Sequence, residues 1–448
     1  HFQEISKGDS KKIGTTKRGI GPAYADKSHR VGVRINDLFD KKILKEKIKL
    51  NLIEKFKLFK HVYNQSQEEI FSQLIESVPN VERYISVKEK LNSLKGQSID
   101  TFSDVLTEIY FEFGENLQKH IISSTVMIKK ALDEGKNILL EGAQGLLLDI
   151  DHGTYPFVTS SNPSVGGLET GLGIAKVDKV YSLIKAYVTR VGSGPFPTEL
   201  TDATGELLRK QGHEFGSTTG RPRRCGWQDV VIARHASAIN GSYVVITKLD
   251  VLGGLKKLKI CNSYKYVGEK KYFNGEIYSE GKIIKDFPAN SDILQNCVPH
   301  DFVEVDGWEE DISNIKNYHD LPLNAKHYLK EIEELGNLKI SKISVGPLRE
   351  QIIEVPGECI CGLESSESSI KIREQYIAAQ EKITTECSEK KYKAVIYDLD
   401  NTLVATNQFV KELILKTATE LTISLPIKIP SEQAIKVVQS KNLPFEVI

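Results

Sequence analysis

The apolar residues of the first third of the chain recur with the period of amphipathic helices. From residue 43 to about 78 they fall mostly three or four positions apart among many lysines, and the break at Asn64 divides this stretch into two helices. A third helical stretch covers residues 102–132, and a fourth, H-Y-L-K-E-I-E-E-L, covers 327–335. The pattern predicts helices that each turn one face to a core.

Shorter apolar runs predict strands. They are N-I-L-L-E at 137–141, S-L-I-K-A-Y-V-T-R-V at 182–191, Y-V-V-I-T-K-L-D at 243–250 and K-I-S-K-I-S-V-G-P-L-R-E at 339–350. The run at 243–250 is typical of a parallel strand that is buried on both faces. Residues 259–278 alternate apolar and polar side chains, which predicts a small antiparallel addition. Glycine-rich stretches at 14–30 and 165–173 predict a loop and a turn.

The composition is that of a large folded protein. The 448 residues include 40% hydrophobic and 27% charged side chains, and this length predicts more than one domain. Lysine and arginine total 60, and aspartate and glutamate also total 60. Bulk charge therefore gives no support to a nucleic-acid partner, and any recognition of anions must be local.

The sequence also favours a cytoplasmic location. It contains no secretory leader and no apolar run long enough to cross a bilayer. The six cysteines are scattered without a zinc-like pair, so reduced thiols are expected. The lysine-rich helix after residue 43 could instead lie on a membrane surface, but Glu54, Glu68 and Glu69 interrupt its charge and favour a stripe that faces the core.

The densest group of anion-binding side chains is the stretch G-S-T-T-G-R-P-R-R-C-G-W-Q-D at 216–229, called here the arginine loop. Guanidinium groups meet carboxylates and phosphates in bidentate geometry, and backbone N–H groups beside glycine can approach the same oxygens. Pro222 limits how far the loop can flex. Arg221, Arg223 and Arg224 make the loop a candidate anion site, with a solvated basic turn as the alternative.

A second candidate ligand segment, E-G-A-Q-G-L-L-L-D-I-D-H-G-T-Y-P-F-V-T-S-S-N, covers residues 141–162. Gln144 lies between two glycines where the predicted strand would deliver a loop to the carboxyl edge of a sheet, the usual ligand position in open α/β folds. The D-I-D-H sequence that starts at Asp149 has the residue types of a metal site. Without further placed ligands, a hydrogen-bonded turn is the favoured interpretation.

The end of the run at 243–250 resembles the N-K-x-D guanine-reading element of GTP-binding proteins, with threonine in place of asparagine. A carboxylate at Asp250 can accept hydrogen bonds from both N1–H and the exocyclic amine of guanine. Adenine would leave that carboxylate unpaired, so the position discriminates between the two bases. The stem of Lys248 can cover the face of the base. An ordinary strand end is the alternative.

Together and in this order, G-T-T-K-R-G-I-G-P-A-Y at 14–24, the segment at 141–162, the arginine loop and the run ending in K-L-D resemble the adenylosuccinate synthetase family over roughly residues 1–355. This family joins IMP to aspartate with GTP as co-substrate. The resemblance implies an α/β fold, with a P-loop-NTPase-like, mostly parallel sheet and helical and small antiparallel additions. It also implies Mg²⁺ and a reaction in two steps, in which GTP phosphorylates the 6-oxygen of IMP and the aspartate amine then displaces that phosphate.

The same resemblance implies which residues hold each substrate. The IMP site takes Thr16, Gln144, Thr159 and Arg221, with Arg30 reaching in from the other subunit of a homodimer. The aspartate site takes Ser217, Thr218, Thr219, Gly220, Arg221, Pro222 and Arg223. The GTP site takes Arg223, Lys248, Leu249, Asp250, Ser344, Val345 and Gly346. Leu348 departs from the aspartate that the family usually has there, whereas Arg349 is retained.

Two motifs of that family do not occur in this sequence. G-D-E-G-K-G-K supplies the aspartate that serves as base and magnesium ligand, and G-H-T supplies the histidine that serves as general acid. Because the chain starts at His1 rather than methionine, we expect both motifs upstream of His1 in a longer protein. The chain as given is then expected to hold its substrates without running the chemistry.

The composition changes towards the C-terminus. We assign residues 1–357 to the synthetase domain, 358–390 to a linker and helix, and 391–448 to a second, partial domain with a Rossmann-like start. The run K-A-V-I-Y-D-L-D-N-T-L-V at 393–404 resembles the first motif of haloacid dehalogenase-like phosphatases. There Asp398 would attack phosphorus and Asp400 would act as acid and base, with Mg²⁺ relieving their repulsion. A chance strand end is the alternative.

Two other functions are compatible with the sequence. One is a protein that binds purine nucleotides without catalysis, which the two missing motifs favour. The other is phosphatase activity from the C-terminal segment around Asp398.

Overall fold

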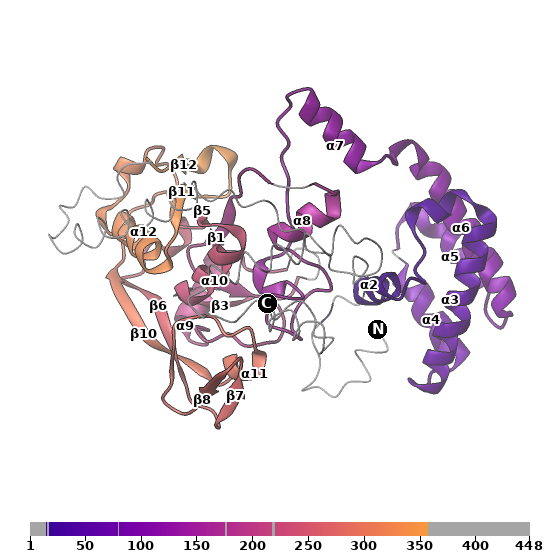
Figure 1. Cartoon of the computed structure of the whole chain (residues 1–448), viewed down its shortest axis with the longest axis horizontal. Helices are drawn as coiled ribbons and strands as arrows, with labels where there is room; N and C mark the ends of the chain where they lie inside the picture. Colours follow the sequence, from indigo (N-terminus) through magenta and orange to yellow (C-terminus); the bar gives the residue numbers. More distant parts are fainter. Residues whose placement is uncertain (1–14, 16–17, 79, 175–176, 217–219, 357–448) are drawn as a thin grey trace, which may run out of the picture. The chain divides into compact units, whose positions relative to one another are not determined.

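The computed structural model of the chain describes residues 15, 18–78, 80–174, 177–216 and 220–356 (Figure 1). Contacts divide the chain into two compact units, His1–Leu363 and Glu364–Ile448. The expected linker at 358–390 and the expected phosphatase-like segment at 391–448 lie outside the described residues.

The first part of the chain forms a group of helices with a core of its own. They are η2 (Ile35–Phe39), α3 (Lys41–His61), α4 (Gln67–Ser77), α5 (Ile85–Asn92) and α6 (Ile99–Leu117). Phe56, Phe71 and Phe102 meet in this core with ring centroids 5.1 to 6.2 Å apart. The two helices expected between 43 and 78 are confirmed as α3 and α4.

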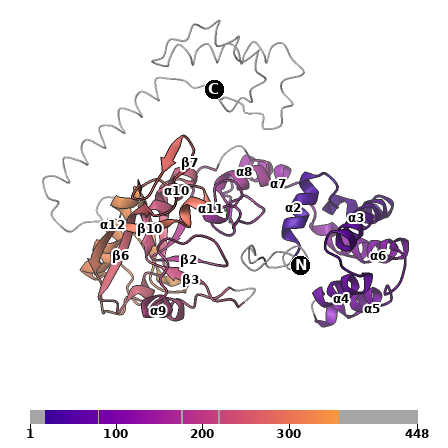
Figure 2. The same ribbon diagram turned by 90° about the horizontal axis from the view of Figure 1, so that it is seen from below.

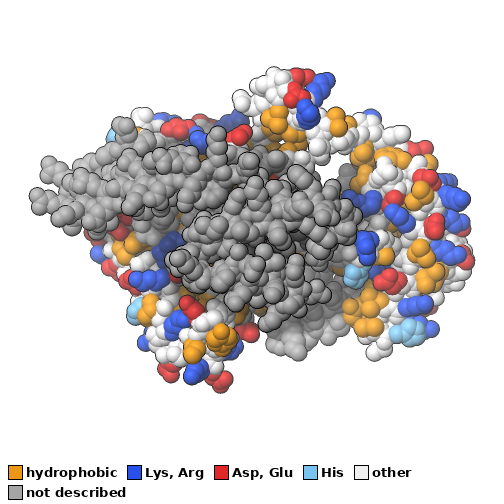
Figure 3. Space-filling view, in the orientation of Figure 1, with side chains coloured by type: hydrophobic (Ala, Val, Ile, Leu, Met, Phe, Trp, Pro, Cys, Tyr) orange, Lys and Arg blue, Asp and Glu red, His pale blue; other side chains and the backbone are white. Residues whose placement is uncertain are grey.

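Ion pairs join α3 and α6, which run antiparallel. They are Lys41–Glu108, Lys45–Asp104 and Lys49–Asp100. Figure 3 shows acidic and basic side chains mixed over the surface of this helical part. Exposed pairs of this kind contribute little stability each, but they balance the lysines of α3 with carboxylates of α6. The charge pattern is thus that of a solvated protein surface with an apolar stripe facing the core, as expected.

Two expectations for this part are wrong. The glycine-rich stretch after Gly19 forms helix α2 (Ile20–Ser28) instead of a loop. Pro22 is tolerated there because it stands in the first turn, where the backbone N–H has no partner within the helix. The helix expected at 102–132 is two helices, because α6 ends at Leu117 and a separate α7 (Ser124–Asp133) begins after Ser123.

The main sheet has the order β1 (Ser182–Lys185), β5 (Tyr243–Thr247), β11 (Lys339–Ser344) and β12 (Ile352–Glu354). β1 and β11 are both parallel to β5, and β12 is antiparallel to β11. The strands expected at 243–250 and 339–350 are therefore confirmed, as is the α/β class with a mostly parallel sheet. The carboxyl ends of the three parallel strands share one edge of the sheet.

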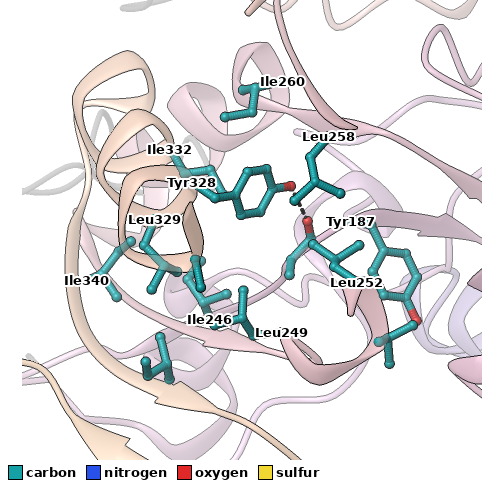
Figure 4. Packing of buried hydrophobic residues seen from close by; sticks show 14 of the residues in the cluster. Tyr187, Ile246, Leu249, Leu252, Leu258, Ile260, Tyr328, Leu329, Ile332 and Ile340 are labelled. Atoms are coloured by element: carbon teal, nitrogen blue, oxygen red, sulfur yellow. Dashed lines mark hydrogen bonds between the residues drawn. The ribbon is translucent and has the colours of Figure 1, made fainter. Parts of the chain in front are cut away.

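Helices α10 (Val230–Asn240) and α12 (Leu323–Gly336) pack on this sheet and bury the main core. Figure 4 shows Tyr328 and Leu329 of α12 close to Ile246 and Ile340 of the strands. The Tyr328 hydroxyl donates a hydrogen bond of 2.6 Å to the carbonyl oxygen of Ala186, so its polar group is satisfied inside the core. The helix expected at 327–335 is confirmed as part of α12.

The antiparallel addition is also confirmed. Strands β6 (Lys257–Tyr266) and β10 (Cys297–Asp306) pair antiparallel, and β9 (Ile283–Ile284) also pairs antiparallel with β6. The short β4 (Gln228–Asp229) is parallel to β6. The neighbouring elements are the hairpin of β7 (Lys271–Phe273) and β8 (Glu276–Tyr278), and α11 (Ser291–Leu294). A separate pair joins β2 (Val188–Arg190) to β3 (Arg224–Gly226), with α9 (Ala203–Gln211) beside β3 (Figure 2).

Three further expectations differ from the structure. Residues 137–141 form no strand and Leu139 is 95% exposed, because no strand among the described residues pairs with this segment. The glycine-rich stretch after 164 is helix α8 (Val165–Leu172), where the Val165 N–H donates to the side chain of Asn240. The run at 182–191 is divided between β1 and β2, which belong to different sheets.

Within the described part of the chain, no helix combines the length and apolar character needed to cross a membrane. Cys225, Cys261 and Cys297 are free and buried, which agrees with the expected reduced thiols. Burial raises the pKa of Cys225 to about 11 and that of Cys297 to about 12, so these thiols stay protonated.

Candidate nucleotide site

Two of the predicted GTP segments meet at the carboxyl edge of the main sheet. Residues 248–250 leave β5, and residues 344–346 leave β11, its parallel neighbour. The Leu249 N–H donates a hydrogen bond of 3.2 Å to the carbonyl oxygen of Ser344. Leu249 and Val345 are fully buried and anchor the two turns. This edge is where open α/β sheets bind ligands.

Asp250 presents a buried acceptor atom that has no partner. Its Oδ1 is buried and accepts no hydrogen bond within the described part of the chain. Burial raises the pKa of this carboxyl above its usual value, against the opposing charge of Lys248. Buried acceptors in native proteins nearly always have a partner, because leaving one unpaired costs free energy. Asp250 therefore offers an acceptor to a donor group from outside the chain.

The turn after β11 is tight. The Ser344 hydroxyl donates to the carbonyl oxygen of Gly346 at 2.6 Å, and the Val345 N–H donates to the carbonyl oxygen of Gln351 at 2.9 Å. A Cβ atom at Gly346 would overlap the Gln351 side chain. Leu348, which departs from the family pattern, is 55% exposed in the same turn. Glycine at 346 thus lets the turn close against Gln351.

Backbone pairs bring together the residues on either side of 217–219. Phe215 pairs with Pro222, the Gly216 N–H donates to the Arg221 carbonyl oxygen, and the Arg223 N–H donates to the Glu214 carbonyl oxygen. Gly220 has a φ of +62°, a left-handed conformation that favours glycine. Ser217, Thr218 and Thr219 lie outside the described residues, so their role in binding aspartate stays a prediction.

The three arginines of this loop have different surroundings. Arg221 is exposed. Arg223 directs Nη1 to Oε2 of Glu214 at 2.8 Å. Arg224 pairs its guanidinium with Glu199, and its Nη1 donates to the carbonyl oxygen of Gly194 at 2.8 Å. Arg223 and Arg224 thus each pair with a carboxylate of the chain, and Arg221 is the most exposed of the three arginines.

Sequence reasoning missed a buried carboxylate beneath the loop. Glu214 is fully buried and accepts hydrogen bonds of 2.7 to 2.8 Å from Lys185, Tyr187 and Arg223, and Lys248 Nζ lies 3.3 Å from its Oε1. Burial alone would raise the pKa of Glu214, but the hydrogen bonds from these donors outweigh it and lower the pKa to about 2. We call these five residues the Glu214 cluster. Glu214 stands alone in Q-G-H-E-F, so no local motif marks it.

The predicted IMP residues are described only in part. Thr159 is half-buried, and its N–H donates to the carbonyl oxygen of Leu148 at 2.8 Å. Gln144 and Arg30 are exposed, and each has a φ of +64°. Thr16 lies outside the described residues. Their assignment to IMP therefore stays a prediction.

The D-I-D-H sequence is confirmed as a hydrogen-bonded turn. The buried Asp149 side chain accepts hydrogen bonds from the N–H groups of Asp151, His152 and Ser164 and from the side chain of Asn162. Among the residues that the structure describes, no three His, Cys, Asp or Glu side chains converge as metal ligands.

The mostly parallel sheet, with its polar turns and unpaired carboxylate at the carboxyl edge, defines an α/β protein with a candidate ligand site at that edge. The family model described as adenylosuccinate synthetase matches residues 1–108 and 86–353. The chain therefore belongs to the adenylosuccinate synthetase family of ligases, and the resemblance drawn from its motifs is confirmed.

Similarity to individual adenylosuccinate synthetases agrees with this family assignment. The adenylosuccinate synthetase of Caldanaerobacter subterraneus subsp. tengcongensis is 43% identical over 355 residues, which cover 79% of this chain and 72% of that protein. That of Bacillus cereus is 44% identical over 356 residues, or 78% of this chain and 71% of that one. The structure of fully ligated adenylosuccinate synthetase from Plasmodium falciparum matches with a TM-score of 0.63 and 34% identity, covering 79% of this chain and 74% of that chain.

Proposed function

We propose that this chain belongs to an enzyme that performs the GTP-dependent ligation of IMP and L-aspartate to adenylosuccinate, the committed step of AMP synthesis, and that its site holds the substrates of that reaction. The observation that carries this proposal is the unpaired Oδ1 of Asp250 at the meeting point of β5 and β11. The edge of guanine offers two donors, N1–H and the 2-amine, to such a carboxylate. Lys248 covers the face of the base with its stem, and residues 344–346 form the neighbouring wall.

The remaining assignments follow the family pattern. Aspartate is held by residues 217–223, and IMP by Thr16, Gln144, Thr159 and Arg221. The surroundings of the two arginines support this assignment, because Arg221 is exposed and Arg223 joins the Glu214 cluster beside Lys248. Mg²⁺ accompanies GTP and binds through the phosphates of that substrate, as this ion usually does. We place the protein in the cytoplasm.

Replacing one carboxylate tests the guanine assignment. Asp250→Asn should weaken GTP binding by about 1 to 3 kcal/mol, because one hydrogen-bonding group of the buried pair is left unsatisfied. The same variant should bind xanthosine triphosphate better than the unmodified chain does, because the new amide can donate to the 2-carbonyl of xanthine. Isothermal titration with both nucleotides measures this. Asp286→Asn, at an exposed loop position, is the control and should leave both affinities unchanged. Unchanged GTP affinity in Asp250→Asn would remove Asp250 from the pocket.

We further propose that this chain binds its substrates without turning them over. G-D-E-G-K-G-K and G-H-T, which carry the base and the acid of the family, do not occur among its 448 residues. The test is an assay for adenylosuccinate with IMP, L-aspartate, GTP and MgCl₂. GTP binding without product supports the proposal, and product formed by this chain alone contradicts it.

A homodimer in which Arg30 reaches the other subunit's IMP site is also proposed. Val31 and Val33, beside Arg30, are 39% and 41% exposed, so apolar surface is available for such a contact. Arg30→Ala should weaken IMP binding while sedimentation still reports a dimer. IMP affinity equal to that of the unmodified chain would exclude Arg30 from the site.

The sequence D-L-D-N-T at 398–402 supports a second activity, hydrolysis of a phosphorylated metabolite. It is tested with p-nitrophenyl phosphate and Mg²⁺ on the full chain. Asp398→Asn should abolish any phosphatase activity that is measured, and activity that survives this change would exclude Asp398 as the nucleophile.

A further inference from the structure

Glu214 contacts both the arginine loop and the segment that follows β5. The Arg223 backbone N–H donates to the Glu214 carbonyl oxygen at 2.8 Å, and the Arg223 guanidinium donates to the Glu214 carboxylate at 2.8 Å. Lys248 Nζ lies 3.3 Å from the other carboxylate oxygen. One buried side chain therefore lies between two residues that are assigned to GTP.

Two further side chains, Lys185 and Tyr187, donate hydrogen bonds to the Glu214 carboxylate. Lys185, at the carboxyl end of β1, donates to both oxygens at 2.8 Å, and the buried Tyr187 donates to Oε1 at 2.7 Å. Lys185 also donates to the Thr189 hydroxyl at 2.8 Å, which limits its own freedom. Both carboxylate oxygens are therefore fixed partners for Arg223 and Lys248. Lys248 Nζ also donates a hydrogen bond to the carbonyl oxygen of Gly212.

The cluster carries more positive than negative charge. Lys185, Arg223 and Lys248 surround the single carboxylate of Glu214. Their side chains are 25%, 28% and 34% exposed, whereas that of Glu214 is 0% exposed. The excess positive charge therefore lies on the solvent side of the cluster, where it favours an anionic ligand such as a nucleotide phosphate.

We propose that Glu214 is a positioning residue for GTP. Its carboxylate keeps Arg223 and Lys248 at a fixed separation and so joins the arginine loop to residues 248–250, the segment assigned to guanine. The inference rests on the proposed function, which assigns Arg223 and Lys248 to GTP. Glu214 acts through these two residues, because its own side chain is fully buried.

Glu214→Gln tests the proposal, since it keeps the shape of the side chain and removes its charge. The new amide group would face the donors of Lys185 and Arg223. We expect the affinity for GTP to fall about tenfold, while the affinity for IMP changes by less than about twofold. Titrations with each nucleotide measure both values at a temperature where circular dichroism shows the chain folded. General damage to the fold would weaken both ligands alike, and that result would contradict the proposal.

A double-mutant cycle separates action through Lys248 from an independent effect. Lys248→Met should weaken GTP binding about tenfold, and Glu214→Gln in that background should add clearly less than its own tenfold, for a total under about 30-fold. Losses that multiply to about 100-fold overturn the proposal. So does a Glu214→Gln variant with the GTP affinity of the unmodified chain.

Two more variants complete the test. Lys185→Met removes a partner of the same carboxylate without changing a predicted GTP residue, so it should weaken GTP binding less than Glu214→Gln does. If Glu214→Gln fails to fold, Glu214→Asp shortens the side chain while keeping its charge, and it should still weaken GTP more than IMP. Equal GTP affinity in Glu214→Asp and the unmodified chain then overturns the inference.

The inference and the proposed function can fail separately. If Asp250→Asn does not weaken GTP binding, the proposed function is overturned, whereas failure of the Glu214 variants alone overturns only this inference.

Discussion

Glu214 makes the stability of the protein depend on pH. Burial alone would raise its pKa, but hydrogen bonds from Lys185, Arg223 and Tyr187 lower it from its usual value of 4.5 to about 2 in the folded chain. Below the usual value the unfolded chain binds the proton more readily than the folded chain. The stabilisation is therefore complete above a pH near the usual value and is lost as the pH falls towards the folded value.

Glu214→Gln should remove this pH-dependent stabilisation. At pH 7 we expect its free energy of unfolding to lie on the order of 3 kcal/mol below that of the unmodified chain, and the difference to shrink as the pH falls through about 4. Urea unfolding between pH 3 and 7 measures the difference. Glu108→Gln, at an exposed pair with Lys41, is the control and should change stability by less than about 1 kcal/mol at every pH. A loss in Glu214→Gln that does not vary with pH would contradict the lowered pKa.

At the scale of single elements, the N-terminus of α10 is capped by a buried side chain, Asp229. Asp229 is 1% exposed and accepts hydrogen bonds from the N–H groups of Val231 and Ile232 and, at 2.6 Å, from the hydroxyl of Tyr264. Burial raises the pKa of Asp229 to about 6 although these bonds oppose it. Asp229→Ala would leave three donors without their acceptor, so it should cost about 2 to 4 kcal/mol of stability.

The matched comparison is the cap of α9. Asp202 accepts from the N–H groups of Thr204 and Gly205, but it is exposed, so water can replace it. Asp202→Ala should cost about 1 kcal/mol. Urea unfolding of both variants measures the two losses. Equal losses would show that capping alone, rather than burial of the Asp229 group, determines the cost.

Some helices and strands could be predicted from the sequence and others could not. Helices α3 and α4 were predictable because three- and four-residue spacing is a local signal. The segment at 137–141 has an equally apolar sequence, yet a strand needs a hydrogen-bonded partner, and none among the described residues pairs with it. The glycines of α8 suggested a turn, but contacts such as that between Val165 and Asn240 lie outside any local pattern.

For the whole molecule, the sequence predicted those segments of the candidate site that carry family motifs. Residues 248–250 and 344–346 carry family motifs, and their meeting follows from the parallel pairing of β5 and β11. Glu214 was not predictable, because its partners come from the end of β1, the arginine loop and the turn after β5. Only the tertiary fold brings those segments together around one carboxylate.

The most direct test of a guanine-reading site is the equilibrium binding of GTP and ATP to the full chain under one set of conditions. The unpaired carboxylate of Asp250 can accept from the N1–H and 2-amine of guanine, whereas adenine offers neither donor. We therefore expect GTP to bind at least about 100-fold more tightly than ATP, since a site built for hydrogen-bond donors rejects a ligand that lacks them. Equal affinities for the two nucleotides would contradict a guanine site at this edge of the sheet.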